Sequence, residues 1–336
     1  MSEMNDRQPA EAPVTGSTKR RVTNQESSGR EQQSQPKGER KRVPVWLWVC
    51  LAAAAVLAML APRVVIGLDV NHPSHFAYKV NEDGQTCTIT GYEGWWGLGE
   101  IRLPVDIPPV SGVYEITIPE SIDGYRVTAI KRFSSMMRMA ALTIPEGVVS
   151  VSSSAFWDSR ELTDIVLPNS LVAIEANPFM NCVNLESIRV YSDHPVYHIT
   201  DGALISADGL LVCFPANAPQ TEFTIPGEVV EIGTYGFYMN RVLRKVTVPG
   251  HVKKIGIHGF HNCRYMTDVV LEAGVEEIDD GAFYACVDLM NVTIPESVRS
   301  IHQSAFMVCT AVTLHVVEGS LGHRFAVEQG LPFVFQ

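Results

Sequence analysis

Residues 246–268 read VTVPGHVKKIGIHGFHNCRYMTD, residues 269–291 read VVLEAGVEEIDDGAFYACVDLMN and residues 292–313 read VTIPESVRSIHQSAFMVCTAVT. The three stretches are near-copies of one motif, in which a phenylalanine is followed three residues later by a cysteine. By subtraction the phenylalanines recur every 23 residues, at Phe260, Phe283 and Phe306. A fixed period of this length predicts a solenoid, in which each unit covers the apolar face of its neighbour.

Each repeat contains an alternating stretch that predicts a short strand. In the Val-Thr-Ile of residues 292–294 the apolar side chains face inward and the threonine faces outward, because side chains alternate along a strand. Pro295 then ends the strand, since proline has no amide proton to donate. Val298 and Ile301 predict an opposite wall, and the stretch around Phe306 predicts a tight turn into the next coil. The expected fold is therefore mostly β, with short turns or helical turns.

The repeats extend over residues 115–313 and are interrupted once. Phe179 and Phe237 are 58 residues apart by subtraction, which is two periods plus twelve, so we place an insert at about residues 194–220. Asp-Gly pairs inside it bracket two apolar runs, which predicts a hairpin growing out of one coil.

The two ends of the repeat array need covers, because an uncovered end exposes unpaired strand edges. Residues 63–114 are expected to form a juxtamembrane segment and an N-terminal capping hairpin, whose turn is Asn81-Glu82-Asp83-Gly84. The adjacent Trp95 and Trp96 either pack on the first coil or form an exposed binding platform. Residues 314–336 are expected to form a C-terminal cap.

The outward strand positions of successive repeats predict one flat face. Stacking in register at about 4.8 Å per strand would align them in a single row of about eight strands. Threonine suits an exposed strand position in any case, so β propensity is a sufficient alternative explanation. The polar members of this candidate ligand face are Thr117, Thr143, Arg189, Thr224, Thr247 and Thr293.

The motif resembles a known family. One repeat is similar to the BspA-like leucine-rich repeat of bacterial and protist surface proteins. The similarity lies in Leu162, Ile165, Leu167 and Pro168, and in the three-residue spacing between Phe179 and Cys182. The resemblance implies a right-handed, curved leucine-rich-repeat solenoid and, for some members, adhesion to host or matrix proteins or to other cells. It brings no catalytic residues. The chain departs from the pattern at three positions, namely Ser159 and Asn240 for cysteine and Glu272 for proline.

The N-terminal part is expected to anchor the chain. Residues 1–42 have almost no large apolar side chain, which predicts a disordered cytoplasmic tail. The apolar stretch Val43–Pro62 has no charge and is long enough to cross a bilayer as one helix. Because Arg40, Lys41 and Arg42 precede it, we expect the N-terminus in the cytoplasm and the repeats outside the cell, in a single-pass bacterial membrane protein. A cleaved signal peptide and a buried core helix are the alternatives.

The charge argues against a nucleic-acid partner. The chain carries a net −11, and residues 1–42 contribute nine Lys or Arg against six acids, which is +3 and leaves −14 for the remainder. Binding phosphates requires a basic face.

Three groups of residues could bear chemistry, and each has a plainer explanation. We expect no metal at His258, His261 and Cys263, because the cysteine belongs to the core pattern. The acidic run of residues 276–280 could bind calcium weakly but is typical of a solvated rim. Of the seven cysteines, Cys50 lies in the apolar stretch, and Cys182, Cys263, Cys286 and Cys309 share an inward position, where we expect free thiols that act as small buried hydrophobes. Disulfides between stacked coils are the alternative, and the pattern does not determine the state of Cys87 and Cys213. We expect no cofactor, and no catalytic signature identifies an enzyme.

Two functions remain as hypotheses. The first is a membrane-anchored surface protein whose repeats bind an extracellular protein or glycan, with adhesion as its use. The alternative is a membrane-tethered structural or signalling protein that acts through its basic cytoplasmic tail on a partner or on anionic lipid.

Overall fold

A computed structural model describes residue 71 and residues 73–92, 114–133 and 139–336. Within those ranges, no helix combines the length and the apolar character that crossing a bilayer requires. The expected tail (1–42), the expected membrane span (43–62) and the two adjacent tryptophans (95 and 96) lie outside the described residues. They therefore stay predictions.

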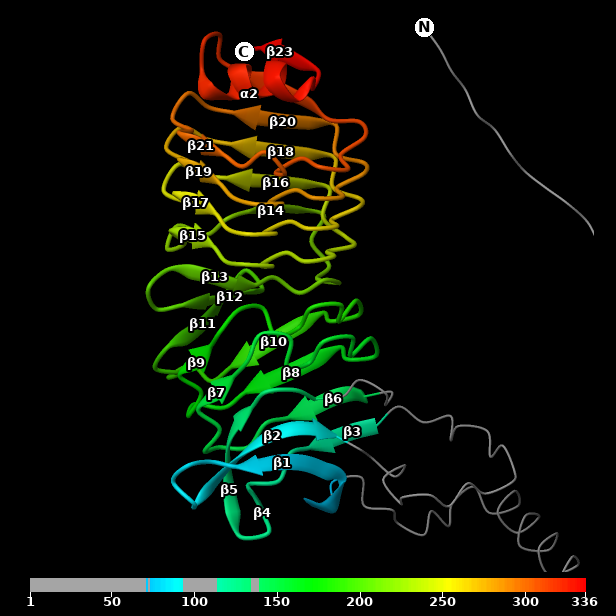
Figure 1. Cartoon of the computed structure of the whole chain (residues 1–336), viewed down its shortest axis with the longest axis vertical. Helices are drawn as coiled ribbons and strands as arrows, with labels where there is room; N and C mark the ends of the chain where they lie inside the picture. The colour runs from blue at the N-terminus through cyan, green and yellow to red at the C-terminus, as the bar shows by residue number, and fades with distance from the viewer. Residues whose placement is uncertain (1–70, 72, 93–113, 134–138) are drawn as a thin grey trace, which may run out of the picture. The chain divides into compact units, whose positions relative to one another are not determined.

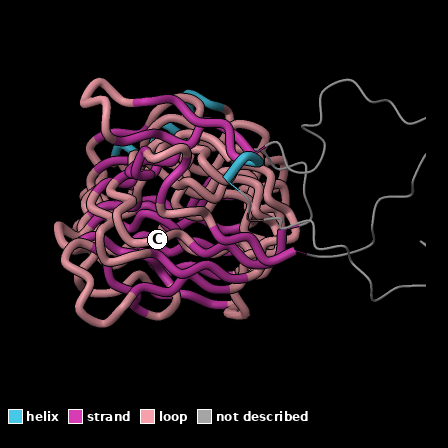
Figure 2. Tube along the Cα trace, turned by 90° about the horizontal axis from the view of Figure 1, so that it is seen from below, coloured by secondary structure: helices cyan, strands magenta, loops and turns pink. Residues whose placement is uncertain are grey.

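The described part of the chain is a β-solenoid, whose coils are stacked along one direction (Figure 1). A typical coil contributes one strand of about four residues to one side and one strand of two residues to the other. We call these sides the long-strand wall and the short-strand wall. Figure 2 looks along the stack and shows strands and loops of successive coils lying over one another.

The long-strand wall consists of two sheets of parallel strands. The first sheet has the order β10-β8-β6-β3 and the second has the order β14-β16-β18-β20-β22-β23. Their bounds are β3 Tyr114–Thr117, β6 Met139–Thr143, β8 Asp164–Leu167, β10 Ser187–Val190, β14 Glu222–Thr224, β16 Lys245–Val248, β18 Asp268–Leu271, β20 Asn291–Ile294, β22 Thr313–Val316 and β23 Phe333–Phe335.

The short-strand wall also consists of two sheets, one of six strands and one of seven. The first has the order β1-β2-β5-β7-β9, with β4 paired to β5, and the second has the order β11-β12-β13-β15-β17-β19-β21. Their bounds are β1 Phe76–Val80, β2 Thr86–Tyr92, β4 Ser121–Ile122, β5 Tyr125–Ile130, β7 Ser150–Val151, β9 Ala173–Ile174, β11 Tyr197–Thr200, β12 Ala203–Ser206, β13 Leu210–Cys213, β15 Glu231–Ile232, β17 Lys254–Ile255, β19 Glu277–Ile278 and β21 Ser300–Ile301.

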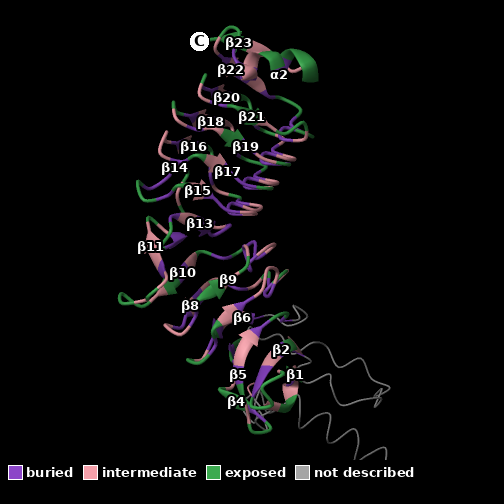
Figure 3. Cartoon of the chain, turned by 60° about the vertical axis from the view of Figure 1, so that its left-hand side comes forward, coloured by how far each residue is buried: buried purple, intermediate pink, exposed green. Residues whose placement is uncertain are grey.

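Aromatic rings fill the centre of the coils, as the 23-residue period predicts. The rings of Phe260 and Phe283 are fully buried, and that of Phe306 is 4% exposed. Phe283 stacks on each of the other two with ring centroids 5.2 Å apart. Buried segments recur from coil to coil (Figure 3). Because one coil has too few apolar residues to offset its loss of conformational entropy, this stacking between coils is what stabilises the fold.

The turn around most of the repeat phenylalanines uses left-handed backbone on both sides. The residues two positions before and two positions after have positive φ around Phe156, Phe237, Phe260 and Phe283, as at Tyr235 (61°) and Met239 (55°), whereas around Phe179 and Phe306 only the following residue does. Asn or Gly adopts this conformation with little strain, but Val308 (66°) is β-branched and does so at a cost. The packed ring fixes the turn despite that cost.

The insert divides the core into two clusters of buried residues. Strands β11, β12 and β13 form an antiparallel meander, and β13 then pairs in parallel with β15. In the described part of the chain, no strand before the insert (β1 to β10) pairs with a strand of the insert or of the repeats after it (β11 to β23). Single hydrogen bonds connect the halves instead: the Ile174 amide donates to the Tyr197 hydroxyl (2.9 Å), the Asn177 side-chain amide donates to the Tyr235 carbonyl (2.7 Å), and the Asn217 backbone amide donates to the Leu185 carbonyl (2.8 Å).

An element that is not a regular coil lies at each end of the described solenoid. At the first end the antiparallel pair β1 and β2 precedes β5, to which β2 pairs in parallel. A one-turn 3-10 helix, η1 (Pro73–His75), leads into β1. At the other end the helix α2 (Leu321–Gln329) and strand β23 follow the last coil. The Ser320 side chain accepts from the His323 amide as the N-cap, and Gly330 ends the helix with φ 66°.

Candidate functional site

The six residues of the candidate ligand face lie at outward positions of the long-strand wall, three on each of its two sheets. In the first sheet Thr117 stands opposite Thr143, and Arg189 stands opposite Val166. In the second sheet Thr224 stands opposite Thr247. The remaining pairs of this second ladder are Thr247 with Val270, Val270 with Thr293, Thr293 with His315 and His315 with Val334.

The face is not the single row that the sequence predicts. Arg189 ends one ladder and Thr224 begins the other, and their strands β10 and β14 belong to different sheets. The physical reason is the insert, whose meander occupies the short-strand wall at this level and interrupts the stacking. Thr117, Thr143, Arg189 and Thr224 are exposed, so each ladder presents polar side chains to solvent.

A second outward column on the same wall is bound together by hydrogen bonds. The Ser187 hydroxyl donates to the Asp164 carboxylate, and this bond lowers the pKa of Asp164. In the other sheet the Asn291 side-chain amide donates to Asp268 (2.8 Å), and the ring of His315 is 3.2 Å from Asn291. These bonds run between coils, so the polar groups of the wall are already oriented before any ligand arrives.

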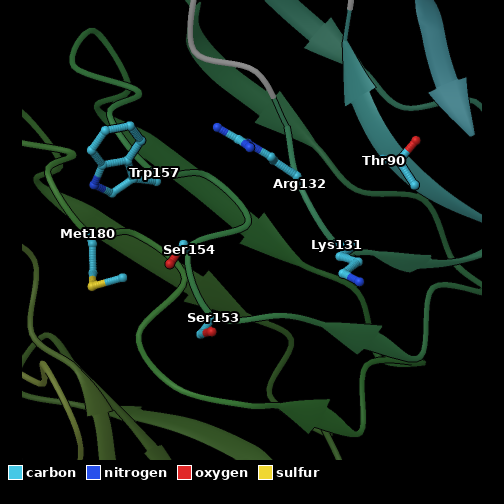
Figure 4. Close-up of a pocket in the computed structure, with 7 residues that line it drawn as sticks. All are labelled: Thr90, Lys131, Arg132, Ser153, Ser154, Trp157 and Met180. Carbon is cyan, nitrogen blue, oxygen red and sulfur yellow. The ribbon is translucent and has the colours of Figure 1, made fainter.

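An open hollow of about 590 Å³ lies at a different place, where the strands β2, β5 and β7 end (Figure 4). Arg132 extends toward the indole of Trp157, beside which Met180 lies, while Lys131 and Thr90 are at the opposite end of the view. The seven lining residues are Thr90, Lys131, Arg132, Ser153, Ser154, Trp157 and Met180. Sequence reasoning missed this site, although Trp157 carried a signal, because it is a large aromatic directly after a core phenylalanine.

The position directly after each buried phenylalanine forms what we call the turn-edge column. In the second half of the repeats its rings stack on one another: Tyr238 on His261 (5.2 Å) and His261 on Tyr284 (4.9 Å). Its members are Trp157, Met180, Tyr238, His261, Tyr284 and Met307. The column is a ridge of large side chains outside the core.

The two histidines of the sequence motif are close together, but the cysteine is elsewhere. The Nδ1 atoms of His258 and His261 are 3.1 Å apart, so one donates a hydrogen bond to the other. The Cys263 thiol is buried and donates to the Phe237 carbonyl (3.0 Å). Burial, followed by the neighbouring His258, lowers the pKa of His261 to about 4. No group of three or more residues suited to a metal occurs in the described ranges.

The acidic run carries ion pairs with neighbouring cations. Asp279 is 2.9 Å from Lys254, and Glu276 is 3.3 Å from Arg299. The hydrogen bond to Asp279 raises the pKa of Lys254. Carboxylates engaged in this way form a paired, solvated rim rather than a cage of free oxygen ligands for calcium.

The described cysteines are free and buried. Cys182, Cys286 and Cys309 each donate from the thiol to the carbonyl of a phenylalanine one coil earlier, at 3.0–3.2 Å. Burial raises the pKa of Cys182 and of Cys309 to about 12, so neither is a thiolate nucleophile near neutral pH. Cys50 lies outside the described residues.

Residues 112–208 and 212–321 match the family described as "BspA type Leucine rich repeat region (6 copies)". A search of curated proteins finds no match. The family match agrees with the resemblance seen in the repeats, and the prediction of that family is confirmed.

Several solved structures are similar to the chain. A leucine-rich repeat protein from Eubacterium ventriosum ATCC 27560 is 18% identical, with 72% of this chain and 82% of that chain covered and a TM-score of 0.41. A leucine-rich cell surface protein from Faecalibacterium prausnitzii A2-165 is 21% identical, with 76% and 96% covered and a TM-score of 0.39. The pneumococcal vaccine antigen PcpA is 19% identical, with 66% and 79% covered and a TM-score of 0.44.

Proposed function

We propose, from the premise that the chain belongs to the BspA-type leucine-rich repeat family, that it is a surface protein that binds an extracellular protein or glycan and serves adhesion. One observation carries this proposal. The outward side chains of the long-strand wall form two ladders of polar residues that include the exposed Thr143, Arg189 and Thr224. The neighbouring outward column, which includes Asp164 and Ser187, is held by hydrogen bonds between coils, and side chains oriented in this way lose little conformational entropy when a partner docks on them.

The proposed attachment to the cell is the apolar stretch 43–62, with the repeats outside. Its support is the sequence: twenty residues without a charge, preceded by three basic residues. Protease treatment of intact cells tests the topology. Digestion of the repeats with survival of an N-terminal tag is expected, and protection of the repeats would contradict it.

The binding surface is tested by an adhesion assay on cells that display the full chain, with immobilised matrix proteins and a glycan array as targets. Thr143→Glu combined with Thr224→Glu places one carboxylate on each ladder and is expected to weaken binding at least tenfold. The matched control is Ser300→Glu, which adds a carboxylate at an exposed position of the short-strand wall. The assignment to the long-strand wall would be contradicted if both variants weakened binding equally, or if neither variant weakened it.

The basic tail supports a second candidate, a tethered signalling or structural role. Residues 1–42 carry the excess of positive charge derived above, which suits an anionic lipid surface or an acidic partner. Deletion of these residues separates the two roles. Adhesion that persists after the deletion supports the first role, whereas loss of function with adhesion intact supports the second.

A further inference from the structure

The hollow beside Trp157 is built from the end of the short-strand wall and the turns that follow. Lys131 and Arg132 come directly after β5, and Ser153 and Ser154 follow β7. Trp157 belongs to the turn of that same coil. The hollow lies away from the long-strand wall, so what it binds is independent of the function proposed above.

The charge of this hollow is opposite to that of the chain. The side chains of Lys131 and Arg132 are exposed, and neither forms an ion pair with any residue that the structure describes. None of the seven lining residues is acidic. Glu175 contacts one side, where its carboxylate accepts from the Ser152 hydroxyl and the Ser153 amide at 3.3 Å each. Two cations therefore face this space on a chain with a net charge of −11.

The indole of Trp157 is the aromatic component of the hollow. Trp157 is 47% exposed, although the preceding Phe156 is fully buried. The backbone on both sides is left-handed, at Ser154 (63°) and Asp158 (64°), and the Trp157 amide donates to the Ser154 carbonyl (3.1 Å). The turn thus fixes where the indole sits while a large part of its apolar surface stays in water. Such a surface favours a ligand with an apolar face.

We propose that this hollow binds an acidic saccharide, that is, a pyranose that carries a carboxylate. The C–H groups on one face of a pyranose carry partial positive charge and would stack on the negative π face of Trp157. The planar guanidinium of Arg132 matches a carboxylate with two parallel hydrogen bonds, and Lys131 adds a second positive charge. The hydroxyls of Ser153 and Ser154 are donors and acceptors for the sugar hydroxyls.

The size and the charge of the hollow select this class of ligand. Its volume of about 590 Å³ falls in the range of ~300–1,000 Å³ that is usual for small-molecule sites. A neutral sugar would use the indole but would leave Arg132 and Lys131 without an anionic partner. A small inorganic anion would pair with the cations but would leave the indole uncovered. A ligand with both features uses the indole of Trp157 and the guanidinium of Arg132 together.

The test uses the full chain in a sugar-free detergent and compares methyl glucuronide with methyl glucoside, two probes that differ in the carboxylate. Saturation-transfer NMR shows which sugar protons contact the protein, and titration gives the affinity. We expect the glucuronide to bind at least tenfold more tightly than the glucoside. We also expect its affinity to fall as salt is raised, because the attraction between charges is screened.

Variants assign the binding to the named side chains. Arg132→Gln is expected to weaken glucuronide binding at least tenfold and to remove the preference over the glucoside. Trp157→Ala is expected to abolish the saturation transfer, while Trp157→Phe retains part of it. Two controls leave binding unchanged: Met307→Ala, at the same position of a later repeat and 53% exposed, and Lys245→Gln, an exposed cation of the long-strand wall.

Three results would overturn the proposal. They are absence of glucuronide binding in the millimolar range, equal affinity for the two probes, and glucuronide binding that Arg132→Gln leaves unchanged. Because Arg132 and Trp157 are exposed, their variants are expected to unfold at the same temperature as the natural chain, and circular dichroism verifies this. If Thr143→Glu combined with Thr224→Glu weakens adhesion but leaves glucuronide binding unchanged, the result bears on the adhesion proposal and not on this hollow.

Discussion

The ring of Phe283 lies parallel to the ring of Phe260, with centroids 5.2 Å apart and planes 3° apart, although the residues are 23 positions apart in the chain. Each ring belongs to a different coil, so the contact joins neighbouring repeats rather than parts of one repeat. The stability of the solenoid therefore depends on pairs of coils.

Phe283→Ala is expected to destabilise the protein by about 3–5 kcal/mol, because it removes a fully buried ring that has a stacked neighbour on each side. Urea unfolding followed by circular dichroism measures the loss. Phe283→Leu, which keeps most of the buried volume, should cost clearly less. An alanine variant that unfolds at the natural urea midpoint would contradict the burial of this ring.

Asn177→Ala is expected to loosen the junction between the two cores. Asn177 is 3% exposed; its side chain donates to the Tyr235 carbonyl (2.7 Å) and accepts from the Phe179 amide (2.9 Å). Leaving such groups unpaired costs about 1–3 kcal/mol. Hydrogen exchange should therefore accelerate at the Phe179 amide and at amides near the junction.

Asn177→Asp is the matched variant for this junction. It retains the acceptor for the Phe179 amide but loses the donor to Tyr235, so it separates the two bonds. Acceleration of exchange in every coil to the same extent would contradict a local role for Asn177.

Ser159→Cys is expected to stabilise the protein by about 1 kcal/mol. Ser159 is 2% exposed, and its hydroxyl has no hydrogen-bond partner among the described residues. A buried hydroxyl without a partner is costly, whereas a thiol behaves as a small apolar group. The cysteine at the same position one repeat later donates to the Phe156 carbonyl at 3.2 Å. A lower urea midpoint for Ser159→Cys than for the natural chain would contradict this explanation, and Ser159→Ala provides the comparison without a thiol.

The stability of the later repeats is expected to fall as the pH is lowered from about 6.5 to about 4. Burial lowers the pKa of His261 in the folded chain to about 4, from a usual value of 6.5, so the unfolded chain binds more protons in this window. The contribution is complete above pH 6.5 and is lost as His261 becomes protonated. Urea midpoints across this range measure it.

His261→Phe is the control for that pH dependence, because it keeps a ring between Tyr238 and Tyr284 and removes the titrating group. Carboxylates also titrate at the lower end of the window, so the difference between the two chains is the informative quantity. A difference in midpoint that does not change with pH would contradict the assignment to His261.

The repeated part of the fold could be predicted because the same local pattern occurs in each coil. The spacing of Phe260 and Phe283 and the alternation in residues 292–294 identify buried rings and strands without knowledge of any other segment. Ser320 and Gly330 are residues typical of helix ends, so the sequence also contains a signal for helix α2 between them. From the sequence we predict a C-terminal cap there without specifying a helix.

Other features could not be predicted, because they depend on how coils sit on one another. The left-handed conformation of Val308 contradicts its own backbone preference and follows from packing. The division of the ligand face after Arg189 follows from the path of the insert. The hollow at Trp157 gathers residues from the first hairpin and from three coils, and no spacing along the chain predicts that Arg132 extends toward an indole.

The equal length of the coils also bears on how such a chain can change over generations. Unequal crossing-over that removes or adds 69 nucleotides, the coding length of 23 residues, would leave every remaining ring above another ring and every strand beside another strand. A change that is not a whole number of coils, and that no outgrowing loop takes up as the insert at about residues 194–220 does, would put a polar side chain where its neighbour presents an apolar one. Gene variants of this protein should therefore grow or shrink by whole coils.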